Sequence, residues 1–394
     1  MTESIKQTLL EIQLENTSSD QGIPREILKR PFTLAPDIVT AIRGVRRCGK
    51  STLMRQMALA LKRPVSFINF EDPRLSDHLD HRLLDVMVKV HEEANPKGPH
   101  YYFMDEVQSV DDWEKWLHVQ LEKRGRQRHF IISGSNATLL GGKLGTALTG
   151  RHLDIELFPF SFSEYKLLKP SSTFDDYFLE GGFPRPLTHE NGPALLREYF
   201  NDIIDRDVRR HVAARSSEAL RQIAKAVFES TGSETSFRKL ANCFDLTPDT
   251  VKTYLDGLAG AYLILPCPYF TYSERQRAVR PKKYYPIDLG LHTAVATKTG
   301  VDKGKKLETL VFHHLRKTYQ EVHYWRGTKE VDLVVETRNG LQPIQVSWEG
   351  MKERHSMAAN EFKEKFPKSL PVRSVDRNNI EKILTEKLSL TAKD

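Results

Sequence analysis

Short apolar runs alternate with amphipathic helical patterns through the first half of the chain. Helical spacing of apolar residues fills the stretches between the runs, for example at residues 51–61 and 113–121. Strands that are apolar on both faces and alternate with helices are typical of a parallel sheet. The pattern predicts an α/β domain at about residues 31–165, after an N-terminal helix and polar linker over residues 1–30. The apolar runs cover residues 38–42, 65–70, 101–104, 130–133 and 153–158.

Beyond residue 170 the strand pattern stops, and residues 194–229 have a mostly helical pattern. Two helices then open at Ser236 and Thr247, and both residues are favourable N-caps. Two strand-like runs follow, at residues 263–270 and 283–287, and the last hundred residues mix helix and strand. We therefore expect three further parts: a helical lid at residues 166–232, a winged helix at 233–295 and a C-terminal α/β domain at 296–394.

The composition adds a modest charge and reduced thiols to this picture. Lys and Arg outnumber Asp and Glu by 59 to 52, which gives a net charge of +7. This excess permits a polyanionic partner without requiring one. The three cysteines, Cys48, Cys243 and Cys267, lie far apart and form no CxxC pair, so neither a disulfide framework nor a zinc site is indicated.

The chain also lacks the apolar segments of a membrane or secreted protein. Its longest apolar stretch, at residues 261–270, contains two prolines and is far shorter than the roughly 20 residues that cross a bilayer. The first residues lack the basic segment and apolar core of a secretory signal. We expect no contact with membranes and a cytoplasmic location.

The segment GVRRCGKS matches the P-loop pattern GxxxxGK[ST] at every fixed position, directly after one apolar run and directly before a helical pattern. Backbone N–H groups of such a loop surround phosphates, Lys50 places its charge on the β and γ oxygens, and the Ser51 hydroxyl ligates magnesium. ATP and Mg²⁺ are therefore the predicted cofactors. The residues predicted to bind the nucleotide are Gly44, Val45, Arg46, Arg47, Cys48, Gly49, Lys50, Ser51 and Thr52.

A second motif supplies the carboxylates that such a site needs. The segment YYFMDE places Asp105 and Glu106 at the end of an apolar run. Asp105 is predicted to hold the metal, and Glu106 is predicted to polarise the attacking water. Glu106 therefore favours hydrolysis over nucleotide binding alone.

Two further groups have two interpretations each. Ser135 and Asn136 follow the next apolar run, where they would orient the water or sense the γ-phosphate, but both types are also common helix N-caps. Arg151 precedes the fifth run and is either an arginine finger for a neighbouring subunit or a surface arginine. All three residues are candidates for the catalytic group.

At this point the sequence resembles the AAA+ ATPases. More narrowly, it resembles the bacterial and archaeal family in which the ATPase is followed by a winged helix and a restriction-endonuclease-like domain. Besides the P-loop and YYFMDEVQ, the resemblance rests on ISGSN, on TGRHLDIELFPFSFSEY from Thr149, on GGFPRPL from Gly181, on Asp205-Arg206-Asp207 and on YYPIDLGL from Tyr284. It implies an α/β P-loop AAA+ ATPase core and an ATP-dependent machine that assembles as a homo-oligomer.

A basic segment between the two later strand-like runs is the candidate DNA contact. It has the position of a winged-helix hairpin wing, which suits phosphate contacts without sequence readout. The outer face of the preceding helix, with Asp249 and Asp256, is not basic, so major-groove reading is not expected. A solvated basic loop or an oligomer contact is the alternative. The five cations predicted to bind DNA are Arg275, Arg277, Arg280, Lys282 and Lys283.

The last part of the chain resembles the ExD…(D/E)xK core of restriction-type nucleases, with Glu308 on an amphipathic helix and Asp332 on a strand. Gln345 stands where such nucleases have their second acid, and Ser347 stands where they have a lysine. Without that lysine, a bound magnesium would have no nearby cation to support the attacking water. We therefore expect this domain to bind DNA without cutting it.

Together these features favour a DNA-dependent AAA+ ATPase that binds and remodels DNA. Branched or junction DNA is a refinement by analogy, because the nuclease fold includes junction resolvases. The main alternative is a signalling or defence-type NTPase whose C-terminal domains bind protein, which the non-basic helix face favours. A nucleotide-binding scaffold without turnover is opposed by Glu106.

Overall fold

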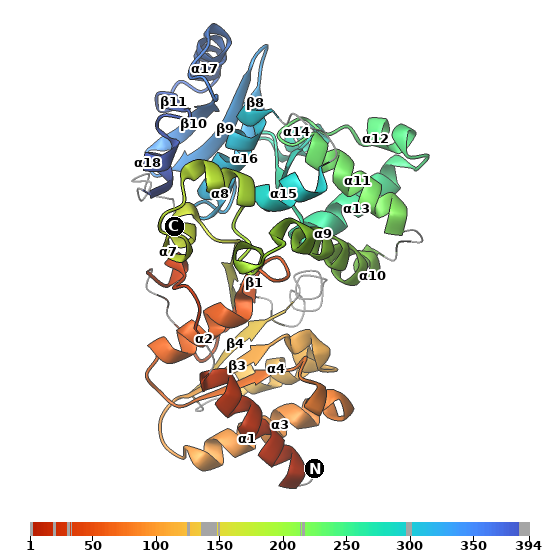
Figure 1. Ribbon diagram of the computed structural model, residues 1–394, viewed down its shortest axis with the longest axis vertical. Helices are drawn as coiled ribbons and strands as arrows, with labels where there is room; N and C mark the ends of the chain where they lie inside the picture. Colours follow the sequence, from red (N-terminus) through yellow and green to blue (C-terminus); the bar gives the residue numbers. More distant parts are fainter. Residues whose placement is uncertain are drawn as a thin grey trace. The chain divides into compact units, whose positions relative to one another are not determined.

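The computed structural model describes residues 3–18, 21–29, 32, 34–123, 127–134, 148, 150–212, 214, 217–296 and 302–385 (Figure 1). Packing divides the chain into two compact units, Met1–Leu157 and Phe158–Asp394. Each unit is described by itself below.

The first unit is built on a five-stranded, fully parallel sheet with the strand order β2-β3-β4-β1-β5. β1 is buried along its whole length, as its unbroken apolar pattern predicts. The predicted α/β class is confirmed, and each of the five apolar runs contains or overlaps a strand. The strands are β1 (Val39–Arg43), β2 (Val65–Asn69), β3 (His100–Asp105), β4 (Arg128–Ser133) and β5 (His152–Glu156).

Helices cover this sheet, and the N-terminal helix belongs to the same core. α1 packs against β2, α2 and α3, and it buries Ile5, Leu9 and Ile12. The structure also contains 3₁₀ turns at Glu26–Lys29, Pro73–His78 and Val107–Ser109. The described helices of the unit are α1 (Glu3–Ser18), α2 (Lys50–Ala60), α3 (His81–Ala94) and α4 (Trp113–Glu122).

The second unit begins with a helical region. Ser161 and Thr173 each form a capping box, which explains why α7 and α8 start where they do. Short irregular helices follow, a 3₁₀ turn at Pro186–Thr188 and a π-helical turn at Ile203–Val208. The α-helices of this part are α7 (Phe162–Leu168), α8 (Phe174–Glu180), α9 (Gly192–Asp202), α10 (Arg209–Val212), α11 (Ser217–Glu229), α12 (Phe237–Cys243), α13 (Pro248–Gly260), α14 (Glu274–Val279) and α15 (Leu289–Val295).

Two segments that carry the family resemblance meet in this region. The carboxylate of Asp288 accepts hydrogen bonds from the backbone N–H of Gly182 at 2.7 Å and of Leu291 at 2.8 Å. Gly181 has a φ of 73°, and a Cβ there would lie 2.3 Å from an Asp288 oxygen. GGFP and IDLGL therefore form one structural joint between the end of α8 and the start of α15.

A hairpin and a four-stranded sheet complete the unit. β6 (Ile264–Cys267) pairs antiparallel with β7 (Lys283–Pro286), and the segment of chain that connects the two strands contains α14. The C-terminal sheet has the order β11-β10-β9-β8, in which only the β10–β11 pair is parallel. Of the helices in the described part of the chain, none has the length and apolar character to cross a bilayer. The remaining elements are β8 (His323–Arg326), β9 (Glu330–Thr337), β10 (Gly340–Val346), β11 (Arg373–Val375), α16 (Lys303–Arg316), α17 (Glu353–Lys365) and α18 (Ile380–Thr385).

Candidate functional site

The P-loop lies between β1 and α2, which is the strand–loop–helix context that its motif requires. Gly49 has a φ of 101° directly before α2, a conformation that favours glycine. Gly44 has no room for a side chain, since a Cβ there would lie 2.2 Å from the Leu157 carbonyl oxygen. Both fixed glycines are therefore required by the shape of the loop.

Lys50 opens α2 and is only 6% exposed. Its Nζ donates hydrogen bonds to the carbonyl oxygens of Gly44 at 3.2 Å and Val45 at 3.3 Å. These neutral acceptors hold the ammonium over the loop without cancelling its charge. Cys48 is fully buried, and burial raises the pKa of its thiol, as expected of a small filler rather than a reactive cysteine.

Asp105 ends β3 and lies beside the end of β4, where the Ser133 hydroxyl donates a hydrogen bond to its Oδ1. Burial raises the pKa of Asp105 and Glu106 adds to this, whereas the Ser133 and Ser51 hydroxyls lower it. Its Oδ2 is buried and has no hydrogen-bond partner among the described residues. A buried carboxylate oxygen in need of a partner, with Ser51 nearby, fits a hard cation such as Mg²⁺. Ser51 and Asp105 are the residues that would hold it.

Glu106 has a left-handed backbone conformation, with a φ of 53°. Its backbone N–H donates to the Ser133 hydroxyl at 3.2 Å, and its Oε2 accepts a hydrogen bond from Gln108 Nε2 at 2.5 Å. A non-glycine residue in this conformation is uncommon and is often found at functional sites. The backbone turn and the amide together fix where the Glu106 carboxylate points.

Sequence reasoning missed Ser133 and Gln108 as parts of this site. The signal for Ser133 was a single hydroxyl at the end of an apolar strand, and Gln108 lies within the YYFMDEVQ segment. Ser135 and Asn136, which were predicted instead, lie outside the described residues. Arg151 is described and exposed, and its proposed role as an arginine finger stays a prediction.

Arg25 is a further residue of this site that the sequence did not indicate. It is 4% exposed, and its Nη1 donates a hydrogen bond to the Cys48 carbonyl oxygen at 2.8 Å. Gln56 of α2 holds the backbone around it, because its amide bonds to Arg25 N, Gln21 O and Ile23 O. A peptide group is planar and trans, so a Cys48 carbonyl pointed at Arg25 turns the Gly49 N–H to the opposite side.

The basic loop between β6 and β7 is less open than the sequence predicts. Arg275 and Arg280 are exposed, and the Arg280 guanidinium lies 4.8 Å from the centre of the Tyr269 ring. Arg277 is engaged within the loop, because it donates to the Thr271 carbonyl at 3.0 Å and pairs with Glu274 at 3.0 Å. Lys282 is partly buried.

Lys283 requires a correction. It is the first residue of β7, and its side chain has an exposure of 0%. An ammonium group buried to this degree cannot contact a phosphate backbone, so Lys283 does not belong to the predicted DNA-binding group. The sequence placed Lys283 in the loop because five cations lie within nine residues there. Only the pairing of β7 with β6 shows that the Lys283 side chain points inward.

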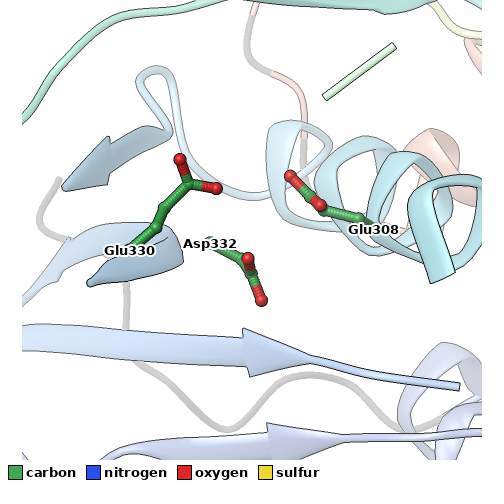
Figure 2. A group of neighbouring side chains, drawn as sticks. All are labelled: Glu308, Glu330 and Asp332. Carbon is green, nitrogen blue, oxygen red and sulfur yellow. The ribbon is translucent and has the colours of Figure 1, made fainter. Parts of the chain in front are cut away.

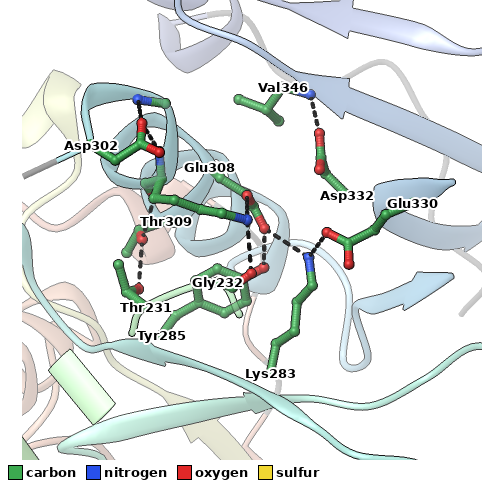
Figure 3. A network of polar contacts seen from close by, with 12 residues as sticks. Thr231, Gly232, Lys283, Tyr285, Asp302, Glu308, Thr309, Glu330, Asp332 and Val346 are labelled. Atoms are coloured by element: carbon green, nitrogen blue, oxygen red, sulfur yellow. Dashed lines mark hydrogen bonds and ion pairs between the residues drawn. The ribbon is translucent and has the colours of Figure 1, made fainter. Parts of the chain in front are cut away.

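Figure 2 shows three carboxylates that face one another, Glu308 on α16 and Glu330 and Asp332 on β9. One oxygen from each lies within 4.8 Å of the others. Lys283 Nζ lies 3.0 Å from Glu308 Oε1 and 2.6 Å from Glu330 Oε1 (Figure 3). The expectation that no cation lies near these acids is therefore wrong, because the lysine comes from a strand outside the motif.

Gln345 on β10 bonds to the third carboxylate. Its Nε2 donates to Asp332 Oδ2 at 2.7 Å, and the Val346 N–H donates to the same oxygen at 2.8 Å. Gln345 Oε1 is buried and has no hydrogen-bond partner among the described residues. Beside this cluster lies a cavity of about 620 Å³. The basic side chains that line the cavity include Lys303, Lys305, Arg326, Lys329, Lys352 and Arg354.

Comparison with known proteins divides the chain into three successive matches. A family model described as an AAA domain matches residues 37–166. Two models described as domains of unknown function match residues 171–302 (DUF8612) and residues 303–385 (DUF4143).

The chain is also similar to two uncharacterized proteins along most of its length. One, from Haemophilus influenzae, is 25% identical over 350 residues, which cover 81% of this chain and 84% of the relative. The other, from Methanocaldococcus jannaschii, is 29% identical over 369 residues, which cover 85% of this chain and 80% of the relative.

Among solved structures, the chain is similar to the RuvB Holliday junction branch migration motor of Thermotoga maritima. The identity is 15%, the match covers 68% of this chain and 90% of that chain, and the TM-score is 0.29. The AAA domain match over residues 37–166, together with the strand–P-loop–helix geometry, supports an AAA+ ATPase fold for this part of the chain.

Proposed function

We propose that this protein hydrolyses ATP in a Mg²⁺-dependent reaction at the P-loop and uses the cycle to bind and remodel DNA. The observation that carries the first half is the buried Oδ2 of Asp105 beside the P-loop, which has no hydrogen-bond partner among the residues that the structure describes. A structural carboxylate is normally satisfied by neighbouring donors, whereas a metal-binding carboxylate keeps an oxygen for the ion.

The residues of the first unit have distinct roles in this proposal. Lys50 neutralises the β and γ phosphates, and Ser133 holds Asp105 in its rotamer through the hydrogen bond to Oδ1. Glu106, whose carboxylate is oriented by Gln108, accepts a proton from the attacking water. A bound Mg²⁺ would neutralise the charge that develops on the phosphate oxygens.

We further propose a homo-oligomer in which Arg151 reaches the nucleotide of a neighbouring subunit. Its exposure supports this role. Protein with Arg151→Ala, mixed with protein with Glu106→Gln, would then regain activity at composite sites. Recovery of activity in mixed assemblies, followed by release of inorganic phosphate, tests the arrangement, and its absence in assemblies shown to mix subunits would exclude it.

The second unit supports the DNA part of the proposal with basic groups at two places. Arg275 and Arg280 are exposed on the β6–β7 loop, and Lys282 is partly exposed beside them. The 620 Å³ cavity of the C-terminal domain has basic side chains along its lining, together with the acids Asp302, Glu308, Glu330, Asp332 and Glu349. Phosphate contacts of this kind give binding without base readout. A preference for branched or junction DNA is the refinement that the nuclease resemblance suggests.

A protein partner is the second candidate, because the same loop also exposes apolar side chains. Tyr272, just before α14, is 74% exposed, and Val279, the last residue of α14, is 79% exposed. The outer face of α13 carries acidic residues, Asp249 and Asp256. Exposed apolar side chains are typical of a protein-binding site, and a helix face that is not basic does not favour DNA.

The test is the ATPase rate with duplex, single-stranded and four-way DNA, together with the dependence of DNA binding on salt. Replacement of Arg275, Arg280 and Lys282 by Ala should weaken binding similarly for all sequences and reduce its dependence on salt. Arg277→Ala in the same loop is the matched control, because its guanidinium is engaged by Thr271 and Glu274. ATP turnover that DNA does not stimulate, with an unchanged salt slope in the triple variant, would favour a protein partner.

A further inference from the structure

The acidic cluster of the C-terminal domain is defined here as Glu308, Glu330 and Asp332. Both oxygens of Glu308 are engaged by groups of the chain itself. Its Oε1 accepts hydrogen bonds from Lys283 Nζ at 3.0 Å and from the Tyr285 hydroxyl at 2.6 Å. Its Oε2 accepts one from Lys305 Nζ at 2.8 Å. Figure 3 shows Lys283 and Tyr285 converging on the Glu308 carboxylate from β7.

The second carboxylate is engaged in the same way. Glu330 Oε1 lies 2.6 Å from Lys283 Nζ, and Glu330 Oε2 lies 3.8 Å from a guanidinium nitrogen of Arg326. The ammonium of Lys283 thus links Glu308 on α16 to Glu330 on β9, and its side chain has no access to solvent. It is not among the residues that line the cavity.

The charges within the cluster nearly balance. Burial opposes the ionised form of Glu308, but Lys283 and Lys305 outweigh it and hold the pKa of Glu308 below its usual value. Burial raises the pKa of Asp332, and the charge of Glu308 raises it further. Gln345 adds no charge at the position where nucleases of this type have a second acid. Two glutamates of the cluster therefore face two lysines, Lys283 and Lys305.

A divalent cation does not fit this arrangement. The resemblance to restriction-type nucleases implies Mg²⁺ here, and an ion of this kind needs carboxylate oxygens that are free to bind it. Both Glu308 oxygens and one Glu330 oxygen are already bonded to ammonium or hydroxyl donors. An ion among the three carboxylates would also be repelled by the buried ammonium of Lys283.

We propose that Lys283 closes the acidic cluster in place of a divalent cation and joins β7 to the C-terminal domain. The lysine comes from the part of the chain that matches one domain of unknown function, and the acids come from the part that matches the next. The nuclease-like centre is then an internal ion-pair joint between these two parts. Gln345 Oε1, which has no hydrogen-bond partner among the described residues, is a ligand position that the ammonium groups leave unfilled.

The proposal predicts that a metal site appears when Lys283 is removed. In Lys283→Met, the three carboxylates and the Gln345 amide oxygen would remain without their central cation, so Mn²⁺ would replace it. The full-length protein without nucleotide should then bind Mn²⁺ at least about tenfold more tightly than the wild type. Its Tm should rise on addition of Mn²⁺, because a ligand that binds only the folded state stabilises it.

Lys282→Met is the matched control, because it removes the same charge from the neighbouring residue, which does not contact the cluster. It should neither bind Mn²⁺ more tightly nor gain a metal-dependent Tm. Adding Asp332→Asn to Lys283→Met should remove the gain. A Lys283→Met protein that folds and gains no Mn²⁺ affinity over wild type overturns the proposal.

The wild-type protein supplies a measurement that does not depend on the folding of this variant. Titration with Mn²⁺, followed by electron paramagnetic resonance, should show no bound ion that Asp332→Asn removes. Saturable Mn²⁺ binding that is lost in Asp332→Asn but retained in Asp105→Asn would place the ion in the acidic cluster and overturn the proposal. Asp105→Asn separates this signal from any ion at the P-loop.

Discussion

Two regions of this protein place a buried lysine beside carboxylates, and they use it in opposite ways. Lys50 at the P-loop is 6% exposed and donates to two backbone carbonyls, and one oxygen of Asp105 nearby has no partner within the described part of the chain. Lys283 at the acidic cluster has an exposure of 0% and donates directly to two carboxylates. The first arrangement keeps its charges available, whereas the second cancels them.

The difference teaches which observation separates a binding site from a structural ion pair. Neutral acceptors orient an ammonium without removing its attraction for a phosphate. In a direct ion pair, the lysine and the carboxylate neutralise each other, so the pair attracts a charged ligand only weakly. Composition alone does not distinguish the two sites, since each has a lysine, acids and hydroxyl groups. The hydrogen-bond partners of each group distinguish them.

The largest effect is expected from substitutions at the P-loop site. Lys50→Ala should abolish ATP binding, because it removes the cation that faces the β and γ phosphates. Glu106→Gln should retain binding and lower kcat by about 10² to 10⁴, because the general base is lost. Equilibrium binding of a fluorescent ATP analogue and single-turnover hydrolysis separate these outcomes. Turnover in Glu106→Gln equal to that of the wild type would remove Glu106 from the mechanism.

The second site should respond in stability rather than in catalysis. Lys283→Met removes the counter-ion that the buried Glu308 shares with the partly exposed Glu330, which should cost about 3 to 5 kcal/mol of the free energy of unfolding. Replacing both glutamates by Gln in the same variant should recover part of that loss. Urea unfolding of the single and triple variants measures both quantities. A single variant as stable as the wild type would show that the ion pair contributes nothing.

The two sites also differ in how far the sequence predicted them. The P-loop residues are consecutive, and Asp105 and Glu106 follow a strand whose position the alternation pattern indicates, so local reasoning was sufficient. Lys283 lies 25 residues before Glu308 and 47 before Glu330, and it joins them only through the strand pairing of the second unit. A single sequence contains no local signal for such a contact.

The basic loop shows the same limit within a few residues. Five cations in nine positions predict one positively charged surface, yet α14 forms inside the loop and β7 begins at Lys283. The alternation of a strand then turns Lys283 inward, where Glu308 and Glu330 accept its charge. The number of cations in the segment is correct, but it does not indicate which of their side chains face solvent.

Asp332 offers a pH test of the acidic cluster. Burial raises its pKa, as does the charge of Glu308, while Lys283 and Lys305 partly oppose the shift. The folded protein therefore holds this proton at pH values where the unfolded chain, with an ordinary pKa of about 3.9, has lost it. By linkage, the contribution of Asp332 to stability falls as the pH rises above about 4 towards neutrality.

Asp332→Asn should remove this loss, because an amide oxygen can accept the same bonds from Gln345 and Val346 without ionising. The Tm of the variant should match that of the wild type near pH 4 and exceed it at pH 8 by at least about 2 °C. Thermal melts of both proteins across this range measure the difference. A gap that stays constant with pH would show that Asp332 does not hold its proton in the folded state.

The smallest effect concerns Arg25, the buried cation of the first unit that the sequence did not indicate. Its hydrogen bond to the Cys48 carbonyl turns the Gly49 N–H away from Arg25, and we expect that N–H to face the bound phosphates. Arg25→Ala should therefore raise the Kd for ATP by about tenfold, the value of one charge-assisted hydrogen bond, and leave kcat nearly unchanged. Arg25→Lys should recover part of the affinity, because an ammonium can still donate to one carbonyl. If Arg25→Ala instead lowers stability and leaves the Kd unchanged, Arg25 only anchors the linker at residues 21–25, as Gln56 does.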